Sequence, residues 1–289
     1  MPEYFCRASS LLPERLRRAA AALSTKERAS CEELRLRVGQ PCTLRMPEGE
    51  IALTGESVTP DILAAVLEKA TGASLHAFED ELRRGFVSAP GGVRVGVCGT
   101  AVCAPGTIQT MRDVSSLCIR IPRPVPGAGK EILPWLTGKS VLILSPPGGG
   151  KTTFLRELVR VVSDSGVRVA LADERGELAG VSGGAAGFDV GRCTDVMTGA
   201  PKAEAALLLL RAMAPDVVAM DEVSAPEDAG AIEMLLGCGV RIYASAHAAD
   251  RAALLRRPVF RRMLDSGAFD ALVCISGRGS SRRYAVETP

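Results

Sequence analysis

The sequence of 289 residues is poor in the residue types that several functional classes require. It has only two histidines, and none of its nine cysteines forms a CxxC pair, so the ligand spacing of a zinc site is missing. Seven Phe, three Tyr and one Trp are few for a protein that stacks the bases of a single strand. The 35 basic and 33 acidic residues nearly balance, so no strong overall field favours nucleic acid or anionic lipid.

Long apolar runs and a secretion signal are also missing. No apolar run approaches the length that spans a bilayer, and the first residues, MPEYFCRASS, lack the basic-then-apolar pattern of a signal peptide. Several cysteines, among them Cys118 and Cys274, lie in apolar runs, where a reduced thiol behaves as a small hydrophobe. We therefore expect a cytoplasmic chain that is soluble or at most peripheral to a membrane.

The most informative stretch that the sequence does contain is 141–162, which reads VLILSPPGGGKTTFLRELVRVV. Four consecutive apolar residues at its start predict a short strand buried on both faces, and apolar residues at its end recur at helical spacing. The glycines between them allow positive φ and a close approach of backbone N–H groups to an anion. The order of strand, loop and helix predicts a phosphate-binding loop. An ordinary glycine-rich turn is the alternative, but the strand, the Gly-Lys-Thr register and the helix together favour nucleotide binding.

Within this loop the residue types suggest separate roles. Lys151 is expected to reach the β- and γ-phosphates of ATP, and the Thr152 hydroxyl to bind Mg²⁺. Thr153 is expected to help hold the α-phosphate or the start of the helix. Serine stands at position 145, where such loops usually have their first glycine. The residues predicted to hold the nucleotide are Ser145, Pro146, Pro147, Gly148, Gly149, Gly150, Lys151, Thr152 and Thr153.

A second candidate piece of the site is the buried strand 216–220, which is followed by two carboxylates. We expect Asp221 to bind the metal through water and Glu222 to polarise the attacking water. Acids at the start of a loop are common, so the pair alone is ambiguous. It follows the phosphate loop by roughly seventy residues, and this order favours a catalytic pair.

Two further segments are predicted at the same edge of the sheet. His247 ends the strand after Glu222, where open α/β folds bind their ligands, and we interpret it as a sensor of the γ-phosphate. A surface or packing histidine is the alternative. The stretch 173–177 follows the strand 167–172, and we expect Glu174 and Arg175 to contact the nucleotide. A solvated charged loop is the alternative for each of these residues.

The segments divide the chain into two predicted domains. Residues 1–125 combine amphipathic helices with alternating strands, which indicates a small α+β domain. A proline- and glycine-rich linker, PRPVPGAG, precedes a region in which strands and helices alternate, so residues 126–289 are predicted to form an α/β domain with a mainly parallel sheet. Its predicted strands are 141–144, 167–172, 216–220, 240–245 and 270–275.

These motifs occur in the order SPPGGGKTTFLRELVR, ADERGELAG, DVGRCTDVMTGAPKAEA, DVVAMDEV, SAHA and RRPVFRRML. Together with ELRLRVGQP, GGVRVGVCGTAV and DVSSLCIRIPR they closely resemble the stage III sporulation protein AA family. That family is similar to secretion and pilus ATPases with a RecA-like P-loop core. The resemblance implies a Mg²⁺-dependent ATPase that forms a homo-oligomer, expected to be a hexameric ring, and binds no specific nucleic acid. It also implies a place in the mother-cell cytoplasm, at the inner face of a membrane, on membrane-embedded sporulation channel proteins.

Phosphoryl transfer also needs a guanidinium at the developing charge. In secretion ATPases that resemble this chain, arginines come from the N-terminal domain or a neighbouring subunit, which makes Arg120, Arg123 and also Arg112 candidates. Arg175 and Arg192 are candidates on the core. Arg120 lies in an alternating strand and could equally face solvent.

Two alternative functions remain open from the sequence. The C-terminal segment is rich in arginine, and a solvated helix face is the default interpretation. The sharper ones are a docking surface for an acidic tail or anionic lipid, and a nucleic-acid-dependent ATPase. The other alternative is a scaffold that binds ATP, assembles and hydrolyses little of it. The pair Asp221 and Glu222 favours hydrolysis over this scaffold.

Overall fold

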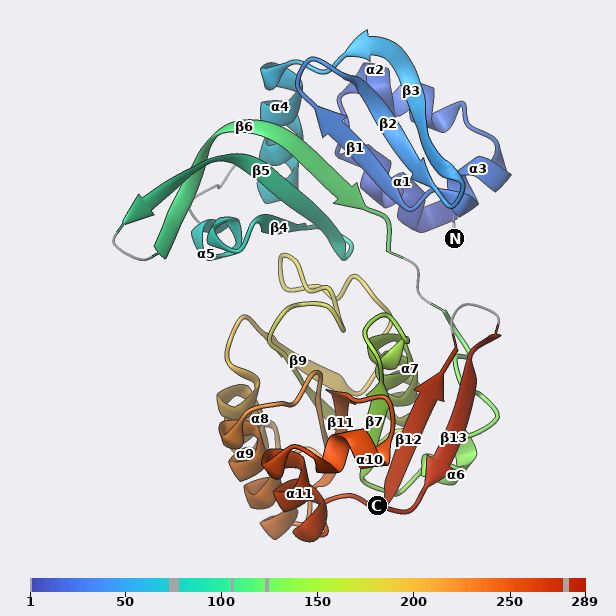
Figure 1. The fold of residues 1–289 in the computed structure, drawn as a ribbon, viewed down its shortest axis with the longest axis vertical. Coiled ribbons are helices and arrows are strands. Elements are labelled where there is room, and N and C mark those ends of the chain that lie inside the picture. The colour runs from blue at the N-terminus through green and yellow to red at the C-terminus, as the bar shows by residue number, and fades with distance from the viewer. Residues whose placement is uncertain (1, 73–77, 105–106, 123–124, 278–280) are drawn as a thin grey trace. The chain divides into compact units, whose positions relative to one another are not determined.

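The computed structural model describes residues 2–72, 78–104, 107–122, 125–277 and 281–289 (Figure 1). The chain forms two compact units, each with its own sheet. The first unit comprises Met1–Arg123 and Gly180–Gly187, and the second comprises Pro124–Ala179 and Phe188–Pro289. Arg123, a predicted finger, and Pro124 lie outside the described residues.

The first unit contains a six-stranded antiparallel sheet in the order β3-β2-β1-β6-β5-β4. Its strands are β1 (Glu33–Arg37), β2 (Pro41–Met46), β3 (Gly49–Ser57), β4 (Phe86–Ala89), β5 (Val93–Ala104) and β6 (Thr107–Arg120). Its helices are α1 (Pro2–Ser10), α2 (Glu14–Ala21), α3 (Thr25–Ser30), α4 (Pro60–Thr71) and α5 (Glu79–Arg83).

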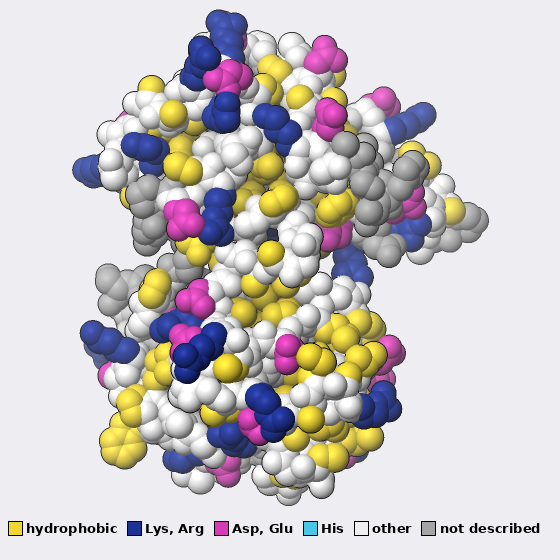
Figure 2. All heavy atoms as spheres, turned by 180° about the vertical axis from the view of Figure 1, so that it is seen from behind, with side chains coloured by type: hydrophobic (Ala, Val, Ile, Leu, Met, Phe, Trp, Pro, Cys, Tyr) yellow, Lys and Arg dark blue, Asp and Glu magenta, His cyan; other side chains and the backbone are white. Residues whose placement is uncertain are grey.

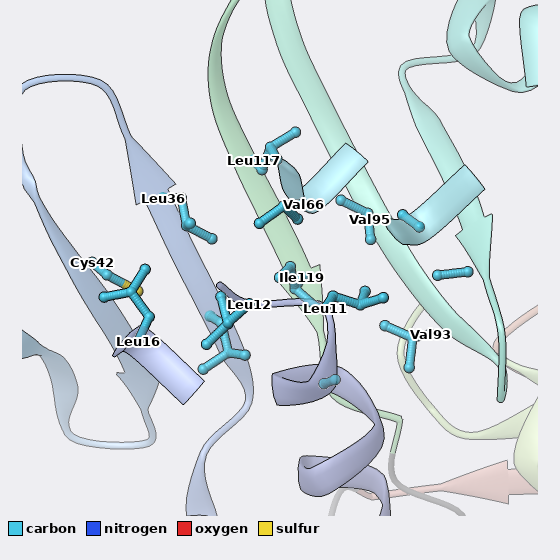
Figure 3. Packing of buried hydrophobic residues seen from close by; sticks show 14 of the residues in the cluster. Leu11, Leu12, Leu16, Leu36, Cys42, Val66, Val93, Val95, Leu117 and Ile119 are labelled. Carbon is cyan, nitrogen blue, oxygen red and sulfur yellow. The ribbon is translucent and has the colours of Figure 1, made fainter. Parts of the chain in front are cut away.

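One face of this sheet is packed and the other is more open, as the alternating sequence of β1 predicts. Leu34 and Leu36 are fully buried, whereas Arg35 and Arg37 between them are half-buried. Figure 3 shows how apolar side chains of the strands meet those of the helices in a shared core. This core gives the unit its own hydrophobic interior.

The second unit contains a seven-stranded sheet in the order β13-β12-β7-β11-β10-β8-β9. All neighbouring strands are parallel except β13, which pairs antiparallel with β12. The strands are β7 (Val141–Ser145), β8 (Val169–Asp173), β9 (Thr194–Thr198), β10 (Val217–Met220), β11 (Arg241–His247), β12 (Ala271–Ser276) and β13 (Arg283–Glu287).

Helices cover both faces of the second sheet. The helices are α6 (Leu133–Leu136), α7 (Lys151–Asp164), α8 (Lys202–Met213), α9 (Pro226–Gly237), α10 (Arg251–Leu255) and α11 (Pro258–Asp265). Helices α8, α9 and α11 share a core with Leu142 and Leu144 of β7, while α7 contacts β7, β8 and β11. Both sides of β7 are therefore buried, which accounts for its unbroken apolar sequence.

The α/β class and the five predicted strands of the second unit are confirmed, with boundaries that shift by up to two residues. The edge strands β9 and β13 were not predicted. Both carry polar and charged residues among apolar ones, since an edge strand lacks the double burial that marks β7. In the described part of the chain, no helix is both long and apolar enough to cross a membrane.

Candidate functional site

The loop between β7 and α7 has the backbone that an anion-binding loop requires. Gly148 and Gly150 have φ of 75° and 99°, which side chains disfavour. A methyl group on Gly149 would lie 2.7 Å from Oγ of Ser145, so this position also excludes a side chain. Helix α7 begins at Lys151 with no side chain capping it, which leaves its first N–H groups to bind an anion.

Serine fits at position 145 because its hydroxyl bonds within the loop. Ser145 is fully buried, and its Oγ donates a hydrogen bond to the carbonyl oxygen of Pro146 at 2.9 Å. The amide of Gly149 donates to the same carbonyl at 3.0 Å. With serine in place of glycine, the turn at the start of the loop is still closed by these two hydrogen bonds.

Glu222 is the centre of a charged cluster at the carboxyl edge of the sheet. One of its carboxylate oxygens, Oε1, lies 3.0 Å from Nζ of Lys151 and 3.1 Å from Nε2 of His247. The other, Oε2, lies 2.6 Å from Nη1 of Arg175. The structure thus brings together side chains from α7, the segment after β8, the segment after β10, and the end of β11.

The backbone at Glu222 is held in an unusual conformation. Its φ is 54°, in the left-handed region that non-glycine residues seldom occupy. Its amide donates to Oγ of Ser245 at 3.0 Å and to Oδ1 of Asp221 at 3.1 Å. These two bonds stabilise a turn that directs the carboxylate towards Lys151, and such strain is common at functional sites.

A second cluster, next to the first, consists of oxygen atoms. Thr152 Oγ1 donates to Oδ2 of Asp221 at 2.7 Å, and Ser245 Oγ donates to Oδ1 of the same carboxylate. A threonine hydroxyl and a carboxylate are hard oxygen donors of the kind that Mg²⁺ prefers. The donor atoms of Thr152 and Asp221 fit a magnesium ion, and their role as its ligands stays a prediction.

The charges around Glu222 keep it ionised. Burial raises the pKa of Glu222, but the hydrogen bond and charge of Lys151, helped by His247 and Arg175, outweigh burial and lower the pKa from its usual value. Asp173 behaves in the opposite way, because burial raises the pKa of its carboxyl despite hydrogen bonds from backbone amides. Glu222 is therefore a carboxylate anion among its three partners.

The segment after β8 is fixed by its first residue. The buried Asp173 accepts hydrogen bonds from the amides of Glu177, Leu178 and Ala179 at 2.8–3.1 Å. Asp173 therefore holds the turn that carries Arg175 to Glu222. Glu174 pairs with Lys202 of α8 at 2.7 Å, and both residues line the same small pocket as Asp221 and Glu222. The predicted contact of Glu174 with the nucleotide stays a prediction.

The candidate finger arginines occupy different places. Arg120 belongs to the first unit and is exposed, with its Nε 3.9 Å from Oε1 of Glu33. Arg112 is exposed beside Asp113, and Arg192 is an exposed residue of the second unit. Arg175 is thus the candidate that contacts the cluster in the described chain.

Two residues of the site were missed by the sequence analysis. Ser245 is fully buried and bonds both Asp221 and the amide of Glu222. A small polar residue two positions before the end of a fully buried strand is the signal that could have indicated it. Lys202 was missed because its partner, Glu174, becomes apparent only when α8 packs on β8.

Comparison with known proteins identifies a family whose sequences this chain resembles. The family described as "Sporulation stage III, protein AA" matches residues 7–284. The stage III sporulation protein AA of Bacillus subtilis (strain 168) is 32% identical over 276 residues, covering 93% of this chain and 90% of that protein.

Solved structures of a pilus retraction motor and of an ATPase share the fold. The pilus retraction motor PilT with bound ADP superimposes with a TM-score of 0.65 at 14% identity, covering 90% of this chain and 79% of that one. The ATPase DotB of Legionella pneumophila gives a TM-score of 0.58 at 15% identity, with coverage of 89% and 76%. These similarities show the fold class, an α/β P-loop core with a preceding α+β part.

Proposed function

Because the chain belongs to the sporulation stage III protein AA family, we propose that it is an ATP-hydrolysing motor that acts in sporulation. The observation that carries this proposal is the convergence of Lys151, Thr152, Asp221 and Glu222 at one edge of a parallel sheet. These residues provide the parts that phosphoryl transfer needs, namely a phosphate cradle, oxygen ligands for a metal and a carboxylate beside them.

The contacts of Lys151 indicate how ATP would change the site. The side chain of Lys151 is only 6% exposed, so its ammonium needs an anion, which Glu222 now supplies. A triphosphate in the loop offers Lys151 a second anion and lowers its dependence on Glu222. The carboxylate of Glu222 then keeps His247 and Arg175 as partners and can accept a proton from water.

Each remaining residue has a defined task in this proposal. The backbone amides at the start of α7 bind phosphate oxygens, and Thr152 and Asp221 hold Mg²⁺. The ion, when bound, neutralises charge on the phosphate oxygens. Ser245 orients both acids, and His247 positions the carboxylate of Glu222 through the bond to its Oε1.

Assembly and location follow the family rather than the geometry. We propose a homo-oligomer, with a hexameric ring as the expected form, in which Arg112, Arg120 or Arg123 completes the site from its own or a neighbouring subunit. The motor would act in the mother-cell cytoplasm on membrane-embedded channel proteins, where it energises assembly or transport.

One face of the molecule carries mixed charge rather than charge of one sign. On the face drawn in Figure 2, Lys and Arg side chains are interspersed with Asp and Glu side chains and with apolar ones. Proteins that follow a phosphate backbone instead gather basic residues along a groove.

The proposal is tested by replacing the carboxylate that is to activate water. Glu222→Gln should retain ATP binding, because the phosphate loop is untouched, and should lower the phosphate release rate by about 100-fold or more. Bound fluorescent ATP and released phosphate are measured on the same preparations. Glu227→Gln, an exposed acid in the first turn of α9, is the matched control and should release phosphate at the wild-type rate. Wild-type turnover in Glu222→Gln would refute the assignment.

A further inference from the structure

Arg282 lies against the phosphate-binding loop of the same chain. A methyl group built on Gly150 would lie 2.6 Å from Cζ of Arg282 and 2.7 Å from its Nη2. The guanidinium therefore occupies the space that a side chain at position 150 would fill. Gly150 directly precedes Lys151 and caps α7, so the guanidinium sits beside the N–H groups that bind phosphate.

The guanidinium has an unused donor at this place. Nε of Arg282 is buried and has no hydrogen-bond partner among the described residues. None of the ion pairs found among those residues includes Arg282. A cation beside the positive end of a helix is electrostatically unfavourable, and a buried donor without an acceptor adds to the cost. A bound anion would relieve both.

Packing fixes the position of Arg282 on the core. The residue immediately precedes β13, which pairs with β12 from Ser276↔Arg283 onwards. Two residues later, the ring of Tyr284 packs on Phe154 in the first turn of α7, with 5.2 Å between ring centroids. The strand that carries Arg282 and the helix that begins at the loop are therefore held together.

Gly129 supports the same contact from a third segment. A methyl group on Gly129 would lie 2.3 Å from Cε2 of Phe154 and 3.4 Å from Cε1 of Tyr284, so the backbone here packs directly on both rings. Arg282 is thus placed by elements that belong to one unit. Its position does not depend on a neighbouring subunit.

We propose that Arg282 binds a phosphate group of the nucleotide from within the same chain. The inference rests on the proposed function, because it names a further residue of the same site. The ligand chemistry is that of a nucleoside polyphosphate, whose oxygens supply the acceptors that the guanidinium lacks. Arg282 differs from Arg112 and Arg120, finger candidates of the first unit, because Arg282 and the loop belong to the same unit.

The test compares nucleotide binding by Arg282→Ala, Arg282→Lys and Arg283→Ala. Arg283 is the matched control, because it is the adjacent arginine and is exposed. Successive side chains in an extended strand point to opposite faces, so the side chain of Arg283 is expected to point away from that of Arg282. The dissociation constants of fluorescent ATP and ADP are measured at one salt concentration. Thermal unfolding of each variant verifies that the fold is retained.

We expect Arg282→Ala to weaken ATP binding by roughly 10-fold or more, the loss of one charge-assisted hydrogen bond. Arg282→Lys should recover part of this affinity, and Arg283→Ala should bind as the wild type does. A loss confined to ATP assigns the contact to the γ-phosphate, and an equal loss for ADP assigns it to the phosphates that both nucleotides share.

Failure of this inference can be told apart from failure of the proposed function. The control is that the wild type binds ATP and Lys151→Ala does not. If folded Arg282→Ala then binds ATP as tightly as the wild type, Arg282 only packs on the loop, and the inference is overturned. If the wild type itself binds neither nucleotide, the proposed function fails. If Arg282→Ala and Arg283→Ala weaken ATP binding equally, the loss of affinity reflects general surface charge, and the inference is also overturned.

Discussion

At the scale of single residues, the site is organised by one carboxylate with three cationic or polar partners. Lys151, His247 and Arg175 all bond Glu222, and each comes from a different segment of the second unit. Removing one partner of a buried ion pair typically costs about 3–5 kcal/mol, because the other charge is left without compensation. The nearly buried Lys151 is therefore expected to have an anion in both states, Glu222 before nucleotide binds and phosphate afterwards.

The lowered pKa of Glu222 predicts the pH dependence of hydrolysis. An acid whose pKa lies below the usual 4.5 loses its charge only when the pH falls below that value. The parameter kcat/KM reports groups of the free enzyme, so Glu222 should contribute no acid limb between about pH 8 and about pH 5. The measurement is phosphate release at low ATP across this range.

A matched variant isolates the contribution of Glu222. His247→Gln keeps a hydrogen-bonding side chain next to the carboxylate and leaves Glu222 and its bond to Lys151 in place. A loss of kcat/KM above about pH 5 that persists in this variant would contradict the ionised state assigned to Glu222.

How much of the site the sequence predicts depends on the type of signal. Residues 145–153, Asp221, Glu222 and His247 can be proposed from their places at strand ends, because parallel strands end at a common edge. Lys202 cannot, because its importance lies in a contact between segments distant in sequence. Ser245 has one weak signal, a small polar residue near the end of a buried strand, and its bond to Asp221 becomes apparent only in the fold. The roles assigned to the predicted residues stay predictions until the variants are measured.

At the scale of elements, burial decides which parts of the fold are predictable. Strands β7, β10 and β11 are covered on both faces, so their apolar runs are visible in the sequence. Strands β9 and β13 lie at the two edges of the sheet and mix polar with apolar residues, which leaves no clear period. Their position follows from pairing with β8 and β12 rather than from their own composition.

Strand β11 carries a buried hydroxyl whose removal should stabilise the protein. Tyr243 is fully buried, burial raises its pKa to about 12, and its hydroxyl has no hydrogen-bond partner among the described residues. Because a buried donor without a partner costs about 1–3 kcal/mol, Tyr243→Phe should raise the free energy of unfolding by about 1 kcal/mol. Urea denaturation provides the measurement.

A second tyrosine serves as the control for this change. Tyr284 is half-buried and contributes its ring to Phe154, a contact that Tyr284→Phe preserves. This variant should unfold at nearly the same urea concentration as the wild type. A destabilisation of more than about 1 kcal/mol by Tyr243→Phe would show that the hydroxyl has a partner and would refute the prediction.

At the scale of the whole molecule, the chain does not divide into its two units at a single point. The segment Gly180–Gly187 belongs to the first unit although β8 before it and β9 after it belong to the second. At its base, Phe188 N donates to the Ala179 carbonyl and Gly187 N to the Gly180 carbonyl. The sequence predicts one domain boundary near residue 125. It does not indicate that Gly180–Gly187 returns to the first unit, because a glycine-rich loop lacks the regularly spaced apolar residues from which elements are predicted.

Phosphate release measured against protein concentration tests whether the chain hydrolyses MgATP, as proposed. If arginines of neighbouring subunits complete the site, the rate per chain rises with protein concentration, and it vanishes in Lys151→Ala. Phosphate release no faster than that of Lys151→Ala at every protein concentration would refute ATP hydrolysis by this chain.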